Sequence, residues 1–286
     1  MSISEKNALN ISKVLTEALP YIRKFNNKVV VIKYGGNAME NKVLKKNFAR
    51  DLVLMKTVGI HPILVHGGGP QIDFELEKNN IKFEFKDGIR KTTLEMINIV
   101  QKVLDNKINK DISELIQFWG GKTSRLAGKK DSPIRAIKDS KKNLGEVGLV
   151  KSIDKKKIMA SLKVGKIPVI SPIGWTSKGG PMNINGDFVA CSIAASLKAE
   201  KIILLTDISG VRNLDGKKIS TMSLKEAKRV LKNKKNIKGG MYPKLTGAID
   251  CLEKGVKNAH IVDGRVPHSV LIELLTDKGV GTWISK

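Results

Sequence analysis

The chain has 286 residues with a formal net charge of +25, and its 28% charged and 41% hydrophobic residues are typical of a globular protein of one large or two modest domains. No apolar run reaches the ~18 residues of a membrane span, and the first ten residues lack the apolar stretch of a secretory signal, so we expect a cytoplasmic protein. The two cysteines and four histidines show no metal-ligand spacing, which predicts that protein ligands hold no metal ion.

An amphipathic helix is predicted first. Apolar residues recur at the i, i+3, i+4, i+7 spacing between Ile11 and Ile22. Pro20 removes one backbone hydrogen bond and should kink this helix or restart it. Two interpretations stay open for this segment: a helix that lies on its own domain, and an arm that packs on another subunit.

A buried strand that ends at two glycines is predicted next. Four β-branched residues, Val29 to Ile32, lead to Lys33, and Gly35 and Gly36 follow, whose backbone a ligand can approach closely. A second apolar run ends in the same way at residues 67–69, and a helical pattern follows each turn, where an anion is favoured. Side by side in a parallel sheet, the two turns would form one phosphate-sized cradle. Either turn alone fits a plain tight turn better, and neither matches a P-loop or G-x-G-x-x-G.

A candidate carboxylate-binding arginine follows. Gly88 marks a turn before Arg90, and Thr92 or Thr93 can cap the helix that is expected to run to about Lys107. A guanidinium in this position can fork onto a carboxylate, but an ordinary surface arginine fits the pattern too. A separate helix is expected over 108–118. Short strands are expected over 122–126, 133–138, 146–152 and 167–170, with a helix over 154–164.

Polar residues gather at the start of a later helix. Residues 172–182 predict a hairpin or lid, and Asn183, Asn185 and Asp187 then precede the helix over 188–197. Capping explains one of the three but not all of them. A strand expected over 202–205, followed by Thr206-Asp207, begins a new strand–helix pattern. We therefore place a domain division near residue 199.

A third glycine turn lies near the C-terminus. Gly239 and Gly240 precede a helix that reaches Lys254, with Pro243 in its first turn and Lys244 just behind it. Glycines and a lysine at a helix start are an arrangement that binds phosphate. A strand over 259–262, a helix over 269–275 and a final strand over 281–284 complete an α/β pattern.

These motifs resemble, in order and spacing, the amino acid kinase family, and within it the branch that phosphorylates N-acetyl-L-glutamate. They are K-Y-G-G-N-A-M (33–39), H-G-G-G-P-Q (66–71), G-I-R (88–90), N-I-N-G-D (183–187), L-T-D (205–207) and G-G-M-Y-P-K (239–244). The resemblance implies a three-layer αβα sandwich around a mainly parallel, open sheet of about eight strands. It further implies an N-terminal arm (1–26), an acceptor lobe (27–198) and an ATP-binding lobe (199–286).

The resemblance also implies residue roles. Lys33 and Lys244 would flank the transferring phosphoryl group, and Asp187 would hold both lysines. Backbone N–H groups would come from Gly36 and Gly69. The acceptor would contact Gly68, Gly69, Arg90, Asn183 and Asn185. The nucleotide would contact Lys33, Gly35, Gly36, Thr206, Asp207, Gly239, Gly240, Met241 and Lys244.

The reaction implied is transfer of the γ-phosphoryl group of ATP to the side-chain carboxylate of N-acetyl-L-glutamate, an early step of arginine biosynthesis. A carboxylate with a pKa near ~4.3 is already ionised at neutral pH and needs no general base. The chemistry instead needs charge neutralisation and in-line alignment, which lysines and backbone N–H groups supply. Mg²⁺ would be held mainly by the nucleotide phosphates.

Two further segments resemble the arginine-inhibited branch of the family. They are the proline-containing N-terminal helix and the stretch P-H-S-V-L-I-E (267–273) that leads to Gly279. The resemblance implies a homohexamer, a trimer of dimers interlaced through the N-terminal helix, and an inhibitory arginine site at Tyr21, Lys217, Glu273 and Gly279. It leaves open whether a PII-type signalling protein binds.

One departure from the family pattern follows Arg90. Lys91, Thr92 and Thr93 stand where the family has an apolar residue, Thr and Asp, which puts the contacts beside Arg90 in question.

Three alternative functions remain: another amino acid kinase such as a glutamate or aspartate kinase, a nucleic-acid-binding protein, and a non-catalytic ligand sensor. Dispersed lysines and only 5% aromatic residues argue against a nucleic-acid partner.

Overall fold

The structure is a computed structural model that describes residues 3–86, 88–140, 143–213, 215–232, 240–277 and 279–286. Its main sheet contains eight strands: β1 (Val29–Tyr34), β2 (His61–His66), β5 (Thr123–Leu126), β8 (Ile167–Ile170), β11 (Lys201–Thr206), β12 (Thr221–Ser223), β13 (Asn258–Asp263) and β14 (Thr282–Ser285). Their order is β12-β14-β13-β11-β1-β2-β8-β5. Only the β13–β14 pairing is antiparallel, so the predicted mainly parallel sheet is confirmed.

Two smaller sheets lie beside the main sheet. One has the order β10-β9-β6-β7, built from β6 (Ile134–Lys138), β7 (Gly148–Ile153), β9 (Ile173–Trp175) and β10 (Pro181–Asn183). The other pairs β3 (Phe85–Lys86) with β4 (Ile89–Arg90). Because β9 and β10 are antiparallel neighbours, the hairpin predicted over 172–182 is confirmed.

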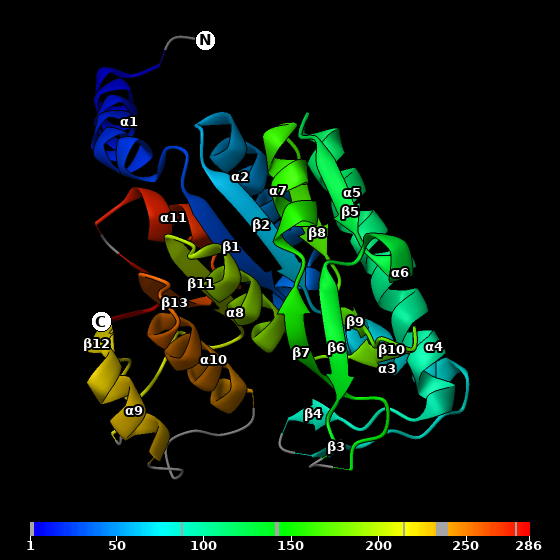
Figure 1. Ribbon diagram of the computed structural model, residues 1–286. Coiled ribbons are helices and arrows are strands. Elements are labelled where there is room, and N and C mark those ends of the chain that lie inside the picture. The colour runs from blue at the N-terminus through cyan, green and yellow to red at the C-terminus, as the bar shows by residue number, and fades with distance from the viewer. Residues whose placement is uncertain (1–2, 87, 141–142, 214, 233–239, 278) are drawn as a thin grey trace.

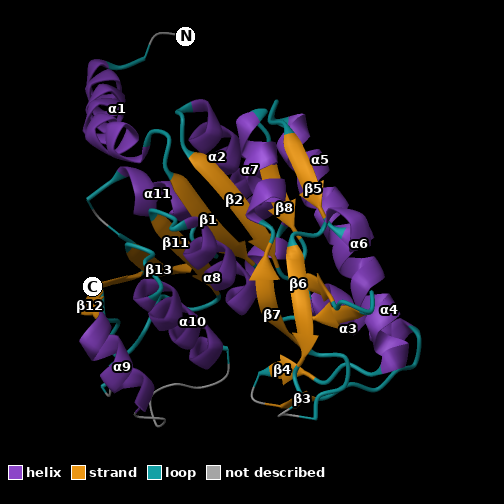
Figure 2. Ribbon diagram, in the orientation of Figure 1, coloured by secondary structure: helices purple, strands orange, loops and turns teal. Residues whose placement is uncertain are grey.

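Helices cover both faces of the main sheet (Figures 1 and 2). Those that pack on one face are α7 (Lys155–Lys163), α8 (Gly186–Leu197) and α10 (Met241–Glu253), with α9 (Leu224–Lys232) beside α10. Those on the other face are α2 (Lys42–Thr57), α5 (Asn109–Phe118) and α11 (Ser269–Leu275). The remaining helices are α1 (Glu5–Phe25), α3 (Gly69–Lys78), α4 (Leu94–Gln101) and the short α6 (Gly128–Asp131). The three-layer architecture follows the prediction.

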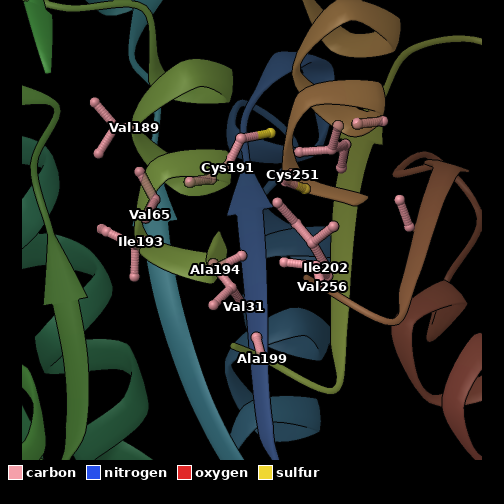
Figure 3. Close-up of a cluster of buried hydrophobic side chains, with 14 of the residues drawn as sticks. Val31, Val65, Val189, Cys191, Ile193, Ala194, Ala199, Ile202, Cys251 and Val256 are labelled. Atoms are coloured by element: carbon pink, nitrogen blue, oxygen red, sulfur yellow. The ribbon is translucent and has the colours of Figure 1, made fainter. Parts of the chain in front are cut away.

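Alternation along β1 explains the two layers of core. Val31 belongs to the buried cluster on the α8 side, whereas Val30 and Ile32 belong to the cluster on the α2 side. Successive side chains of a strand point to opposite faces, so a strand with consecutive apolar residues requires cover on both sides. Figure 3 shows the first cluster, with side chains of β1 and β2 against those of α8 and the free Cys251 of α10.

The helical boundaries differ from the predictions at two places. α1 continues through Pro20 to Phe25, so the expected restart at Pro20 is wrong. The predicted break between Lys107 and Ile108 is also wrong, because a π-helical segment, η2 (Lys102–Ile108), joins α4 to α5 without interruption.

The domain division near residue 199 stays a prediction, and the main sheet crosses it where β11 pairs with β1. Within the described ranges, no helix has the length and apolar character to cross a membrane.

Candidate active site

The two glycine turns predicted to form a cradle are neighbours. β1 and β2 pair in parallel with Tyr34 opposite His66, so both turns begin at the same edge of the sheet. The Gly67 N–H donates to the Tyr34 carbonyl at 2.7 Å. A Cβ placed on Gly67 would lie 3.8 Å from the Gly35 Cα. The parallel register thus places the two turns side by side, as expected from the sequence.

A carboxylate flanked by two lysines lies at these turns. Asp187, in the first turn of α8, has one oxygen 2.9 Å from the Lys244 Nζ of α10 and the other 3.5 Å from the Lys33 Nζ of β1. The three side chains are only 5–12% exposed. Lys33 also covers Gly35, where a Cβ would lie 2.5 Å from the Lys33 Nζ. One strand and two helices therefore meet at a nearly buried charge cluster.

Electrostatics make this cluster receptive to an anion. Burial acts to raise the pKa of Asp187, but Lys244 and Lys33 outweigh it and hold that pKa below its usual value. Burial lowers the pKa of Lys33, and Lys244 lowers it further, while Asp187 acts in the opposite direction. Two ammonium groups flank the Asp187 carboxylate, and the Asp207 carboxylate also acts on Lys33, at a place where solvent screening is weak. Such a centre suits a group that gains negative charge, such as a phosphoryl group in transfer.

Gly36 and Asp207 form the next part of the site. Gly36 has φ +74° and opens a 3₁₀ turn, η1 (Gly36–Met39). Asp207 directly follows β11, the neighbour of β1, and its carboxylate lies against Gly36: a Cβ there would be 2.4 Å from Asp207 Oδ1. Gly36 is therefore required both by its left-handed backbone and by the close approach of Asp207.

We expect Gly36→Ala to reduce kcat by at least ~10-fold, because the new methyl group would displace the Asp207 carboxylate. Gly165→Ala is the matched control, since Gly165 has φ +73° but a Cβ on it would meet no heavy atom within 4 Å. Both variants should lose ~1 kcal/mol of unfolding free energy from the left-handed backbone. Equal activities in the two variants, measured beside their denaturation midpoints, would contradict the role given to the Asp207 contact.

Arg90 is buried, so the alternative of an ordinary surface arginine is wrong. Its guanidinium forms an ion pair with Asp73 of α3 and lies 4.7 Å from the ring centre of Phe83 and 4.5 Å from that of Phe85. One nitrogen donates to the Gly69 carbonyl at 3.4 Å. Asp73 was not predicted from the sequence as a partner, although its place in the first turns after the glycine loop was a usable signal.

The departure at Lys91, Thr92 and Thr93 has a local explanation. The Thr93 hydroxyl accepts from the Met96 N–H and caps α4, as an aspartate would. Lys91 forms an ion pair with Glu84 across the β3–β4 hairpin. Thr92 is fully buried, and its hydroxyl donates to the Arg90 carbonyl at 3.1 Å.

The two asparagines before Asp187 do different things. The Asn183 amide donates to the Thr92 hydroxyl at 3.0 Å, which links Asn183 to the strand that carries Arg90. The Asn185 side chain accepts from the Asp187 N–H at 2.8 Å and caps α8. Capping thus accounts for Asn185, whereas Asn183 is linked through Thr92 to the segment that carries Arg90.

The remaining predicted residues divide between packed and open positions. Gly68 packs against η2, since a Cβ would lie 2.3 Å from Ile108, whereas no heavy atom lies within 4 Å of one on Gly69. The Thr206 carbonyl accepts from the Gly264 N–H at 2.8 Å. Gly240 and the buried Met241 begin α10. Gly239 lies outside the described residues. Among the described side chains, no group of three or more His, Cys, Asp or Glu could hold a metal ion.

Three of the four residues predicted for arginine lie together. Tyr21, Glu273 and Gly279 line a cavity of about 370 Å³ between α1 and α11. Lys217 is not among the residues that line this cavity, and its backbone N–H donates to the Asn213 side chain at 2.9 Å, so its part in an arginine site stays a prediction. Lys201 lines the cavity instead and donates to the Glu273 carbonyl at 3.0 Å, while burial lowers its pKa to about 8.

A sequence model of the amino acid kinase family matches residues 28–263. The acetylglutamate kinase of Hahella chejuensis (strain KCTC 2396) is 45% identical over 296 positions, which cover 99% of this chain and 98% of that protein. That of Syntrophus aciditrophicus (strain SB) is 48% identical, with 95% of each chain covered.

Solved structures share the fold. The N-acetylglutamate synthase from Neisseria gonorrhoeae, complexed with coenzyme A and N-acetyl-glutamate, superimposes with a TM-score of 0.86 at 24% identity. The match covers 96% of this chain, which spans 63% of the synthase. The carbamate kinase from Giardia lamblia bound to AMP-PNP has a TM-score of 0.64 at 16% identity, over 91% of this chain and 99% of that one.

Proposed function

This chain belongs to the amino acid kinase family, and from that premise we propose that it transfers the γ-phosphoryl group of ATP to the side-chain carboxylate of N-acetyl-L-glutamate in arginine biosynthesis. Relatives that are 45–48% identical over nearly the whole chain are acetylglutamate kinases. The observation that carries the proposal is the Lys33–Asp187–Lys244 cluster beside two glycine turns. It supplies positive charge and backbone donors at one point, which carboxyl phosphorylation needs.

The cluster suits in-line transfer. Lys33 stabilises the group on the acceptor side, and Lys244 stabilises it on the ATP side. The N–H groups of Gly36 and Gly69 add donors for the transferring oxygens. Asp187 holds both ammonium groups at fixed positions, so little reorganisation is needed when charge develops.

The residues around the second glycine turn (67–69) bind the acceptor. Arg90 takes the α-carboxylate of N-acetyl-L-glutamate, with Asn183, Gly68 and Gly69 as further contacts. The ion pair with Asp73 and the two phenylalanine rings fix the guanidinium plane. A fixed plane favours two parallel hydrogen bonds to a carboxylate.

The nucleotide binds on the side of the Lys33–Asp187–Lys244 cluster that is opposite to the acceptor. Its contacts are Gly35, Gly36, Thr206, Asp207, Gly240, Met241 and Lys244, which come from the turns after β1 and β11 and the start of α10. Mg²⁺ would accompany the nucleotide, held mainly by the phosphate oxygens, and would supply charge neutralisation there.

We also propose that arginine inhibits this enzyme by feedback. The cavity lined by Tyr21, Lys201 and Glu273 offers a buried carboxylate for the guanidinium of arginine. The other face of α1 supports a role in assembly, because its apolar side chains Leu9, Ile11, Val14 and Leu15 are 51–70% exposed. Burial of these residues against α1 of another subunit would give the hexamer.

We expect purified protein to release ADP from MgATP with N-acetyl-L-glutamate, but not with glutamate or aspartate, and to lose turnover in millimolar arginine. A variant lacking residues 1–24 is the matched comparison, since it removes the exposed face of α1 and Tyr21. It should assemble into smaller particles and lose the arginine response while keeping turnover. Turnover with glutamate alone would overturn the substrate assignment, and an unchanged particle size with an unchanged arginine response would overturn the hexamer and the arginine site.

A further inference from the structure

We propose that His66 is a positioning residue: its imidazole fixes the Gly67–Gly69 turn so that the N–H of Gly68 faces the acceptor. The inference rests on the proposed function for its catalytic consequence. Its structural part stands on a chain of buried hydrogen bonds below the turn. Neither the motif nor the comparisons assign His66 a role.

The bonding pattern determines which imidazole nitrogen carries the proton. Arg125 can only donate, and its Nε lies 3.1 Å from the Asn109 Oδ1, so the Asn109 nitrogen must face the other way. That nitrogen donates to the Val169 carbonyl at 2.9 Å and lies 3.2 Å from the His66 Nε2. The Nε2 atom is therefore an acceptor, and the proton of a neutral imidazole is on Nδ1.

The protonated nitrogen faces the glycine turn. His66 Nδ1 lies 2.9 Å from the Gly67 carbonyl oxygen, which can only accept. His66 is fully buried, and burial lowers its pKa to about 4, so the ring is neutral at working pH. A neutral ring with one fixed tautomer keeps this bond in a single orientation.

The bond sets the direction of a backbone donor. In a planar trans peptide the C=O and the next N–H point in opposite directions. His66 holds the Gly67 carbonyl toward the interior, so the Gly68 N–H points outward. The Gly67 N–H is tied to Tyr34 at 2.7 Å, which secures the other end of the turn. Among the described residues, no acceptor pairs with the Gly68 N–H. This N–H can therefore donate a hydrogen bond to a ligand.

The π-helical segment supports the same assignment. η2 ends at Ile108, directly before Asn109, and both Ile108 and Leu104 contact Gly68. The π-helical segment thus packs on the glycine loop, and the residue that follows it carries the amide next to the His66 Nε2. π-Helical turns are frequent at functional sites.

Two substitutions at His66 separate positioning from bulk stability. In His66→Asn the amide nitrogen reaches the place of Nδ1 and can still donate to Gly67, whereas in His66→Gln it reaches the place of Nε2 and cannot. We expect His66→Gln to lower kcat ~10- to 100-fold, with KM for ATP unchanged, which is at or below the effect of losing one transition-state donor. His66→Asn should stay within ~3-fold of the unaltered protein.

Hydrogen exchange supplies a readout that does not depend on turnover. Exchange across residues 62–76, followed by mass spectrometry, should accelerate at least ~5-fold in His66→Gln and remain unchanged in His66→Asn, because the Gly67 N–H is protected by the turn. Equal kcat and equal exchange in the two variants would overturn the proposal. If the unaltered protein does not phosphorylate N-acetyl-L-glutamate, the proposed function fails, and exchange alone decides the positioning role.

A second variant leaves His66 in place. The double substitution Asn109→Leu and Ser171→Ala removes both groups near Nε2, since the Ser171 hydroxyl lies 3.3 Å from it. We expect the same pattern of accelerated exchange and reduced kcat. If His66→Gln does not fold, the double variant tests the positioning role in its place. Unchanged hydrogen exchange in the double variant would contradict the proposal that Asn109 and Ser171 fix the tautomer of His66.

Discussion

Lys33→Ala and Lys244→Ala are each expected to lower kcat by at least ~100-fold, the scale of losing one transition-state donor. The two ammonium groups lie nearest to different oxygens of the same carboxylate, so we expect that neither can replace the other at the transferring group. The loss should appear in kcat rather than in KM, because these charges interact most strongly with the group as it moves. Steady-state rates over both substrate concentrations measure it.

The control for Lys244→Ala lies near the end of the same helix. Lys254 is the exposed C-cap residue of α10 and pairs with Asp250, so Lys254→Ala removes the same charge away from the site. It should leave kcat within ~2-fold, because an exposed pair is worth little. A near-normal kcat in Lys33→Ala or Lys244→Ala would remove that lysine from the mechanism.

Asp187→Asn should reduce kcat at least ~100-fold and unfolding free energy by ~3 kcal/mol, since it removes the carboxylate that pairs with both buried ammonium groups. Asp250→Asn, at a carboxylate of α10 that forms an exposed pair, is the control and should change neither quantity appreciably. Denaturant titration and initial rates measure the two effects.

The pH dependence of Asp187→Asn follows from the same cluster. Asp187 raises the pKa of Lys33 against the effect of burial, so its loss lowers that pKa further. A lysine pKa that is lower in the folded than in the unfolded protein makes the native state bind fewer protons, so stability rises with pH between the two pKa values. Activity, which needs the charged form, should instead fall with rising pH, and should do so at a lower pH than in the unaltered protein. Coincident alkaline limbs in the two pH–rate profiles would contradict this.

The sequence by itself determined much of this site. Strands ending at Gly35-Gly36 and at Gly67–Gly69 are local features, since an apolar run and glycine set backbone conformation wherever they lie. Parallel pairing of such strands then brings their ends to one edge. The family and the enzyme class followed from motif order and are confirmed by the relatives.

Only the tertiary structure decided the partners of the charged side chains. No local pattern pairs Arg90 with Asp73, places Lys201 rather than Lys217 beside Glu273, or sets Arg125 and Asn109 below His66. Those choices depend on which residues of distant segments meet when the helices pack on the sheet. A buried charge or amide must find a partner within hydrogen-bond distance, and packing alone determines which one is there.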